Sequence, residues 1–124
     1  MKIFVTGVSG QLGHDVMNEL NKRGYEGIGS DIAPEYAGAS DMAEDDDKVE
    51  LVRQVNAKGT ENIALVCKKL DCKMVYISTD YVFDGQGTKP WEPDCKDYKP
   101  LNVYGQTKLE GELAVSQNLD KYFI

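Results

Sequence analysis

Two groups of polar residues have the types and the spacing needed for proton transfer, and the first is a tyrosine–lysine pair. Tyr104 and Lys108 stand four residues apart, which places them on one face of any helix that contains both. A lysine charge close to a phenol favours the phenolate, so it lowers a pKa near 10 towards the working range of a general acid. The pair is common by itself, so its meaning depends on its surroundings.

The second group follows a strand-like run at residues 73–79. There Thr79, Asp80 and Tyr81 bring a hydroxyl, a carboxylate and a phenol directly after an apolar segment. Open α/β sheets bind their ligands at the carboxyl ends of the strands. We therefore expect this group to border a site, and to share it with the tyrosine–lysine pair.

A glycine-rich loop, GVSGQLG, separates the first strand-like run from a helix-like one. In a dinucleotide fingerprint Gly7 makes a tight turn, Gly10 lets the backbone approach a pyrophosphate, and Gly13 allows close helix packing. The helix N-terminus offers N–H groups to the phosphates. Asp31 ends the second strand, where it would accept hydrogen bonds from ribose hydroxyls and repel a 2′-phosphate. The pattern predicts a dinucleotide site that prefers NADH to NADPH, the alternative being a glycine turn that only packs.

The hydrophobic pattern supplies elements that could hold these residues. Residues 1–31 predict a βαβ unit, and parallel strands follow from such a unit. The elements expected beyond it are a long helix at 49–70, a buried strand at 73–79, a loop at 85–100, a helix that Asn102 caps, and a strand starting at 122. This order predicts an α/β fold with a doubly wound parallel sheet of the Rossmann type.

Bulk composition excludes several partners. The chain has 124 residues and a net charge of −7, so it fits one domain and would repel nucleic acid and anionic membranes alike. No apolar run approaches the length of a membrane span, and three cysteines without CxxC spacing predict free thiols, so we expect a cytoplasmic protein. The acidic cluster at 41–47 is typical of a solvated face, and no metal site is expected from it.

Four motifs together resemble one family. TGVSGQLG, VNAKGTENI, YISTDYVFDG and PLNVYGQTKLEGE are similar to dTDP-4-dehydrorhamnose reductases, which belong to the extended short-chain dehydrogenase/reductase superfamily. The resemblance covers nearly all of the chain. It implies a nicotinamide dinucleotide held on the loop by Gly7, Gly10, Gln11 and Leu12, with Lys108 at the nicotinamide ribose.

The resemblance also implies a role for each polar residue at the site. Thr79 would hydrogen-bond the substrate carbonyl, Tyr104 would give it a proton, and Lys108 would tune Tyr104. Asp80 and Tyr81 would border the sugar. Hydride transfer would then reduce the 4-keto group of a dTDP-linked 4-keto-6-deoxy sugar, turning dTDP-4-dehydrorhamnose into dTDP-rhamnose for cell-surface polysaccharide synthesis. Asn56 would shape its helix and anchor a water rather than do chemistry.

Other members of the superfamily supply the alternatives. Sugar-nucleotide dehydratases carry a glutamate where this chain has Tyr81, so the second carboxylate that elimination needs is missing and reduction is favoured over dehydration or epimerisation. The regulatory subunit of methionine adenosyltransferase is similar too, which keeps a non-catalytic dinucleotide-binding role open. The sequence leaves open a monomer or a homodimer, and whether Mg²⁺ bridges subunits.

The chain departs from the family pattern at two places. Family members have a strand, a helix and another strand after the residue that corresponds to Asp31, whereas here Asp41 opens the next family motif after only nine residues. We expect central strands to be missing, with a junction within residues 34–41. The C-terminal substrate domain of the family lies mostly beyond the position of Ile124, so residues 1–124 are expected to form a partial Rossmann domain.

Overall fold

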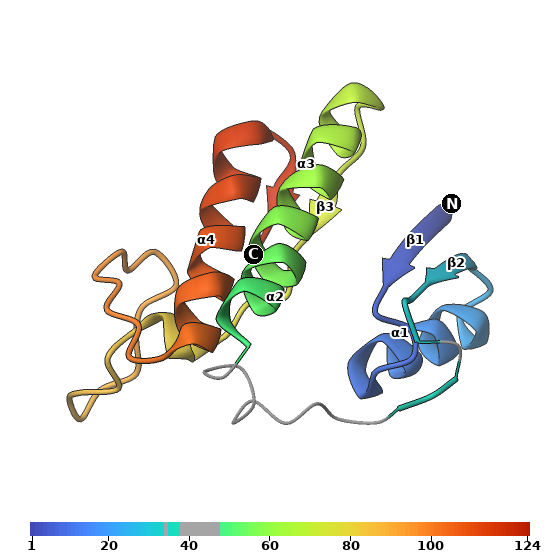
Figure 1. Ribbon diagram of the computed structural model, residues 1–124. Coiled ribbons are helices and arrows are strands. Elements are labelled where there is room, and N and C mark those ends of the chain that lie inside the picture. The colour runs from blue at the N-terminus through green and yellow to red at the C-terminus, as the bar shows by residue number, and fades with distance from the viewer. Residues whose placement is uncertain (34, 38–47) are drawn as a thin grey trace. The chain divides into compact units, whose positions relative to one another are not determined.

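A computed structural model of the chain describes residues 1–33, 35–37 and 48–124 (Figure 1). The chain divides into two compact units, Met1–Asp41 and Met42–Ile124, each of which is described by itself. The acidic cluster at 41–47 lies wholly outside the described residues, and so does most of the expected junction at 34–41.

The first unit is the βαβ unit that the sequence predicts. Strand β1 (Lys2–Thr6) leads into helix α1 (Gln11–Lys22), and strand β2 (Glu26–Ser30) returns parallel to β1 in the register Lys2↔Glu26 to Thr6↔Ser30. The helix ends where Gly24 adopts a φ of +75°, a left-handed conformation that glycine reaches without steric cost.

Helix α1 covers one face of this two-stranded sheet. Gly27 of β2 lies against Met17 and Leu20 of the helix, so a side chain at that position would compete with them for space. Phe4 and its register partner Ile28 lie on the other face, where they are 60% and 46% exposed. The described part of the first unit therefore buries only one side of its sheet.

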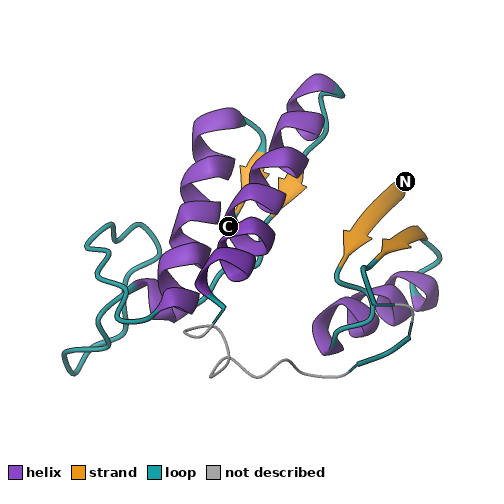
Figure 2. Cartoon of the chain, in the orientation of Figure 1, coloured by secondary structure: helices purple, strands orange, loops and turns teal. Residues whose placement is uncertain are grey.

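The second unit is built on two helical segments that pack side by side (Figures 1 and 2). The first runs through α2 (Val49–Arg53), the π-helix η2 (Gln54–Gly59) and α3 (Thr60–Lys69), and the second is α4 (Val103–Asn118). The predicted helix at 49–70 is confirmed, but residues 54–59 within it are π-helical, which the hydrophobic spacing did not indicate.

Short parallel strands β3 (Met74–Val75) and β4 (Tyr122–Phe123) lie against these helices (Figure 2). Met74 and Tyr76 are buried in a core with Ala64, Val115 and Leu119.

The prediction of a buried strand at 73–79 was wrong in two respects. Regular pairing covers two residues only, since β4 offers two partners. Val75 and Ile77 are 64% and 55% exposed, because within the second unit the helices cover one face of the strand and side chains alternate between faces. The described parallel strands thus form two separate two-stranded sheets.

Helix α4 begins at the cap that the sequence predicts. The side-chain oxygen of Asn102 accepts a hydrogen bond from the backbone N–H of Gly105 at 2.7 Å. Asn102→Ala should lower the free energy of unfolding by about 1 kcal/mol, as loss of an N-cap commonly does, whereas Asn102→Asp should keep most of it. Urea denaturation of both variants checks this, and equal losses would show that the side-chain acceptor does not stabilise the start of the helix.

Three further observations concern membrane, metal and thiol chemistry. No helix in the described residues has the length and apolar character needed to cross a membrane. In the same ranges no three His, Cys, Asp or Glu side chains are placed to hold a metal ion. Cys67, Cys72 and Cys95 are free thiols, as predicted.

Candidate active site

The glycine loop of the first unit has the geometry of a tight turn that opens a helix. Gly7 has a φ of +74°, and its carbonyl oxygen accepts a hydrogen bond from the N–H of Gly10 at 3.1 Å. A Cβ at Gly13 would overlap that same carbonyl group, so the first turn of α1 packs directly on the loop. The first N–H groups of α1 have no acceptor within the helix, and Gln11 and Leu12, which carry the first two, are exposed. The loop therefore fits a pyrophosphate group.

Asp31 is tied to this loop by backbone hydrogen bonds. Its two carboxylate oxygens accept from the N–H of Ser9 at 2.8 Å and from that of Ala33 at 2.9 Å, while the hydroxyl of Ser9 donates to the carbonyl of Ala33. The bonds from Ala33 and Ser9 hold the pKa of Asp31 below its usual value. The carboxylate is thus ionised at neutral pH, and its remaining lone pairs can still accept hydrogen bonds.

The lowered pKa of Asp31 predicts a pH dependence of stability. A carboxyl group whose pKa is lower in the folded state stabilises the fold above its unfolded pKa of about 3.9, and that contribution is lost as pH falls through the folded pKa. Asp31→Asn should therefore flatten the acid limb of the stability curve below about pH 4. Thermal unfolding between acidic and neutral pH measures the slopes, and identical acid limbs for variant and wild type would contradict the assignment.

The second unit brings the strand end and helix α4 together. The hydroxyl of Thr79 accepts from the N–H of Tyr81 and donates to the carboxylate of Asp80, both at 3.3 Å, and so caps the short 3₁₀ helix η3 (Asp80–Val82). The ring of Tyr81 meets the ring of Tyr104 edge to face, with centroids 5.8 Å apart. The predicted substrate residues are therefore placed beside the candidate acid.

Gly105 makes that approach possible, and our sequence reasoning did not single it out. A Cβ at Gly105 would overlap the backbone carbonyl of Tyr81, so the first turn of α4 can pack on η3 only without a side chain there. A glycine inside the first turn of a helix costs helix propensity, and this mismatch is the signal that could have found it.

Lys108 lies one turn after Tyr104 on α4. Its ammonium donates to the backbone carbonyl of Ile77 and lies 4.2 Å from the centroid of the Tyr76 ring. Burial lowers the pKa of Lys108, while the nearby charge of Glu112 opposes that shift. The ammonium is thus anchored beside the strand that leads to Thr79.

A buried polar contact ties the π-helix to α4. The side-chain amide of Asn56 donates to the hydroxyl of Thr107 at 3.2 Å, and that fully buried hydroxyl can donate in turn to the carbonyl of Val103 or Tyr104. The carbonyl of Asn56 itself accepts from the hydroxyl of Thr60 at 2.7 Å. Asn56 therefore helps to hold α4 against the π-helix, a contact that the sequence expectation of a helix-shaping residue did not include.

The structure thus assembles the predicted site residues in two sets. The loop residues Gly7, Gly10, Gln11, Leu12 and Gly13 belong to the first unit with Asp31, and Thr79, Asp80, Tyr81, Tyr104 and Lys108 belong to the second. Next to Thr79, the hydroxyl of Ser78 is buried and has no hydrogen-bond partner among the described residues. Such a group beside the candidate catalytic set fits a site that receives a polar ligand.

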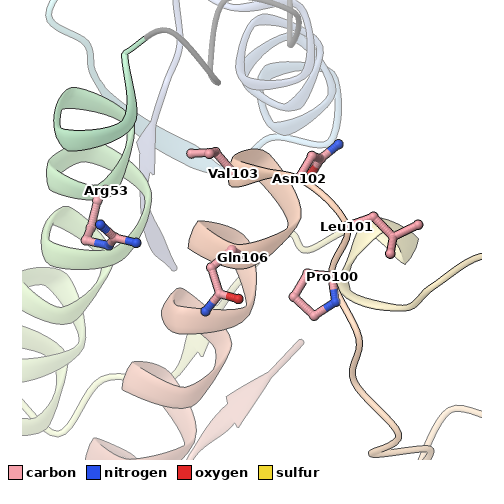
Figure 3. Close-up of a pocket in the computed structure, with 6 residues that line it drawn as sticks. All are labelled: Arg53, Pro100, Leu101, Asn102, Val103 and Gln106. Atoms are coloured by element: carbon pink, nitrogen blue, oxygen red, sulfur yellow. The ribbon is translucent and has the colours of Figure 1, made fainter.

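A pocket of about 360 Å³ near the start of α4 is a different feature (Figure 3). It lies between α2 and the first turn of α4 and is lined by Arg53, Pro100, Leu101, Asn102, Val103 and Gln106. None of the candidate catalytic side chains lines it. The site therefore has to be argued from the contacts of Thr79, Tyr104 and Lys108 and not from this cavity.

Comparison with known proteins decides the family. The RmlD substrate binding domain family matches residues 35–124, which is more than half of the chain. The chain belongs to this family. The resemblance drawn from the four sequence motifs is thereby confirmed.

Curated relatives include both reductases and a regulatory subunit. The chain is 37% identical to the dTDP-4-dehydrorhamnose reductase of Escherichia coli K12 over 98 residues, which cover 78% of this chain and 32% of that protein. The corresponding enzyme of Mycolicibacterium smegmatis is 29% identical over 135 residues, covering 92% and 41%. Methionine adenosyltransferase 2 subunit beta of Xenopus laevis is 45% identical over 69 residues, covering 56% and 20%. The chain therefore spans less than half the length of these relatives.

Solved structures confirm the Rossmann-type fold class. A dTDP-4-dehydrorhamnose reductase from Clostridium acetobutylicum superposes with a TM-score of 0.85 at 29% identity, covering 98% of this chain and 51% of that one. The enzyme from Bacillus anthracis, solved in complex with NADP, gives a TM-score of 0.82 at 28% identity, covering 99% and 51%. The chain thus has the fold of about half of each neighbour.

Proposed function

We propose that this chain carries the cofactor loop and the catalytic residues of an NAD(P)H-dependent reductase that acts on the 4-keto group of a dTDP-linked 6-deoxy sugar. The observation that carries the proposal is the packing of the first turns of α4, with Tyr104 and Lys108, against the turn that holds Thr79 and Tyr81. Membership of the RmlD family and the identity to named reductases support the same reaction.

Thr79, Tyr104 and Lys108 have different tasks in the proposed reaction. A bound nicotinamide dinucleotide supplies the hydride. The hydroxyl of Thr79 hydrogen-bonds the substrate carbonyl, and the phenol of Tyr104 gives its proton to the oxygen as the carbonyl is reduced. The ammonium of Lys108 holds the nicotinamide ribose and favours the phenolate that Tyr104 leaves behind. The chemistry needs no second carboxylate, which agrees with a phenol at Tyr81.

The cofactor would lie on the glycine loop, held at Gly7, Gly10, Gln11, Leu12 and Gly13. The Bacillus anthracis neighbour binds NADP, which supports a nicotinamide dinucleotide here too. Asp31 favours NADH over NADPH, because its ionised carboxylate is fixed at the loop and would repel a 2′-phosphate.

The substrate and the setting follow from the relatives and the charge. Asp80 and Tyr81 are proposed to border the sugar of dTDP-4-dehydrorhamnose. The proposed product is dTDP-rhamnose, which would be used in the synthesis of cell-surface polysaccharide. A net charge of −7 favours a protein that works without nucleic acid or membrane partners, and we place it in the cytoplasm as a monomer or homodimer.

A direct assay of the full-length protein tests this function. We expect NADH to be oxidised only when dTDP-4-dehydrorhamnose (dTDP-4-dehydro-6-deoxy-L-mannose) is added. NADPH should be used less efficiently than NADH. Tight NADH binding without oxidation by any 4-keto sugar nucleotide would overturn the reductase assignment.

A second function is favoured by one observation, the 45% identity to subunit beta of a methionine adenosyltransferase. In that case the fold would bind a dinucleotide and act as a regulatory partner without turnover. Mixing the full-length protein with a methionine adenosyltransferase catalytic subunit and measuring complex formation by size-exclusion chromatography separates the two functions. The reductase proposal expects turnover and no complex.

We also propose that residues 1–124 are a partial Rossmann domain that lacks an internal segment within residues 34–41. The match to the Mycolicibacterium smegmatis enzyme extends over 135 aligned positions. It includes 92% of the 124 residues of this chain, which is about 114 residues, so roughly 20 positions of that relative have no counterpart here. Sheets of two strands with exposed Phe4, Ile28, Val75 and Ile77 support the same conclusion. The intact mass of the natural protein tests it, since a mass of 13.8 kDa would overturn it.

A further inference from the structure

Tyr76 contacts Lys108 at both ends of the lysine residue. The ammonium of Lys108 lies 4.2 Å from the centroid of the Tyr76 ring, and the hydroxyl of Tyr76 donates to the backbone carbonyl of Lys108 at 3.3 Å. One side chain of the core thus meets both the charged group and the helix turn that carries it.

The position of Tyr76 is fixed by its surroundings. The residue is 8% exposed and belongs to the core formed with Met74, Ala64 and Val115. Its hydroxyl reaches α4 because residue 111 is a glycine: a Cβ at Gly111 would overlap that hydroxyl and crowd the backbone carbonyl of Asn56. The missing side chain at Gly111 therefore creates the space that the Tyr76–Lys108 contact needs.

The donors of the ammonium can be accounted for. An ammonium group has three N–H donors. One of them donates to the carbonyl of Ile77, and the ammonium also faces the ring of Tyr76. An aromatic face attracts a cation, more strongly where water is excluded. Both contacts leave the group charged and able to donate to a hydroxyl of a bound ligand.

We infer that Tyr76 is a positioning residue, which holds the Lys108 ammonium in place through its ring and fixes the surrounding turn of α4 through its hydroxyl. The catalytic consequence rests on the proposed function, in which Lys108 holds the nicotinamide ribose and tunes Tyr104. The contact itself does not rest on it. Nothing in the family motifs quoted above assigns this role to Tyr76, which lies upstream of the polar strand end.

Tyr76 could also be no more than a core side chain, and two variants distinguish these roles. Tyr76→Phe keeps the ring under the ammonium and loses the hydroxyl bond, whereas Tyr76→Leu removes the ring and keeps an apolar core. Met74→Leu is the matched control, since Met74 lies two residues before Tyr76, is about equally buried and has no contact with Lys108 among those observed. Glu112, whose charge acts on the Lys108 ammonium, is unchanged in every variant, and so is Tyr104 on the same helix.

The test is a titration of Lys108 by NMR with isotope-labelled lysine in the full-length protein, together with the Kd of NADH. We expect Tyr76→Leu to lower the pKa of Lys108 by about one unit and to weaken NADH binding about tenfold, because the ring stabilises the charged form. Tyr76→Phe should retain the pKa, and Met74→Leu should change neither quantity. An unchanged pKa in Tyr76→Leu, or an equal shift in Met74→Leu, would overturn the inference.

The reaction provides a second readout that separates this inference from the proposed function. In an active enzyme, Tyr76→Leu should lower kcat and shift the pH profile of kcat, because a smaller fraction of Lys108 is then protonated to assist Tyr104. Tyr76→Phe should keep kcat and the pH profile close to those of the wild type. A protein without reductase activity would refute the proposed function, while the NMR titration would still decide the role of Tyr76.

Discussion

Tyr104→Phe in the full-length protein should reduce the turnover of a 4-keto sugar nucleotide by about 10²–10⁴-fold, the usual contribution of a general acid. The phenol is the proton donor of the proposed reaction, and phenylalanine keeps the ring that packs against Tyr81 while removing the proton. The Kd of NADH should change by no more than about twofold, since the hydroxyl takes no part in the glycine loop. Steady-state kinetics and a binding titration measure the two quantities.

The matched control for this variant is Tyr25→Phe. Tyr25 is 43% exposed in the first unit and belongs to neither set of site residues, so its hydroxyl can be removed without touching the candidate chemistry. Turnover in Tyr25→Phe should equal that of the wild type. If Tyr104→Phe retained more than a tenth of the wild-type kcat, another group would have to supply the proton and the proposed role of Tyr104 would be wrong.

Gly13→Ala should nearly abolish dinucleotide binding, with an increase of about 100-fold or more in the Kd of NADH. The added Cβ would overlap the carbonyl of Gly7, which is backbone and cannot move without opening the turn. Overpacking of this kind typically costs 1–3 kcal/mol of stability, and here it would also displace the start of α1 from the phosphates. Fluorescence titration with NADH and urea denaturation measure the two effects.

Gly59→Ala is the control for that substitution. A Cβ at Gly59 would lie 3.5 Å from the carbonyl oxygen of Gln54, an ordinary van der Waals contact, and the residue is inside a helical segment where alanine is preferred. This variant should bind NADH as the wild type does and be at least as stable. NADH affinity that is unchanged in Gly13→Ala would rule out the glycine loop as the cofactor site.

Local chemistry explains why much of the fold could be predicted. Glycines between a β-branched run and a helical pattern predict a strand, a turn and a helix, and the structure has β1, α1 and β2 in this order within the expected residues 1–31. Asn102 caps α4 because an amide oxygen placed before a helix can accept an N–H from its first turn. These features depend on residues a few positions apart, so the sequence contains them almost completely.

Contacts between distant segments explain what could not be predicted. The π-helix at 54–59 coincides with the buried Asn56–Thr107 hydrogen bond, which joins residues 51 positions apart. The exposure of Val75 and Ile77 likewise depends on which layers cover the strand, and periodicity within the strand cannot report this.

The sequence by itself determined which groups are available for chemistry: the glycine loop, Asp31, Thr79, Tyr104 and Lys108. Their types and short-range spacing follow from local rules of turns, caps and helix faces. Only the tertiary structure decided how these groups are held, through Gly105 against Tyr81, Gly111 against Tyr76, and Tyr76 under Lys108. The physical reason is that close packing joins segments about 25 to 35 residues apart in the chain, where the absence of a side chain matters as much as the presence of one.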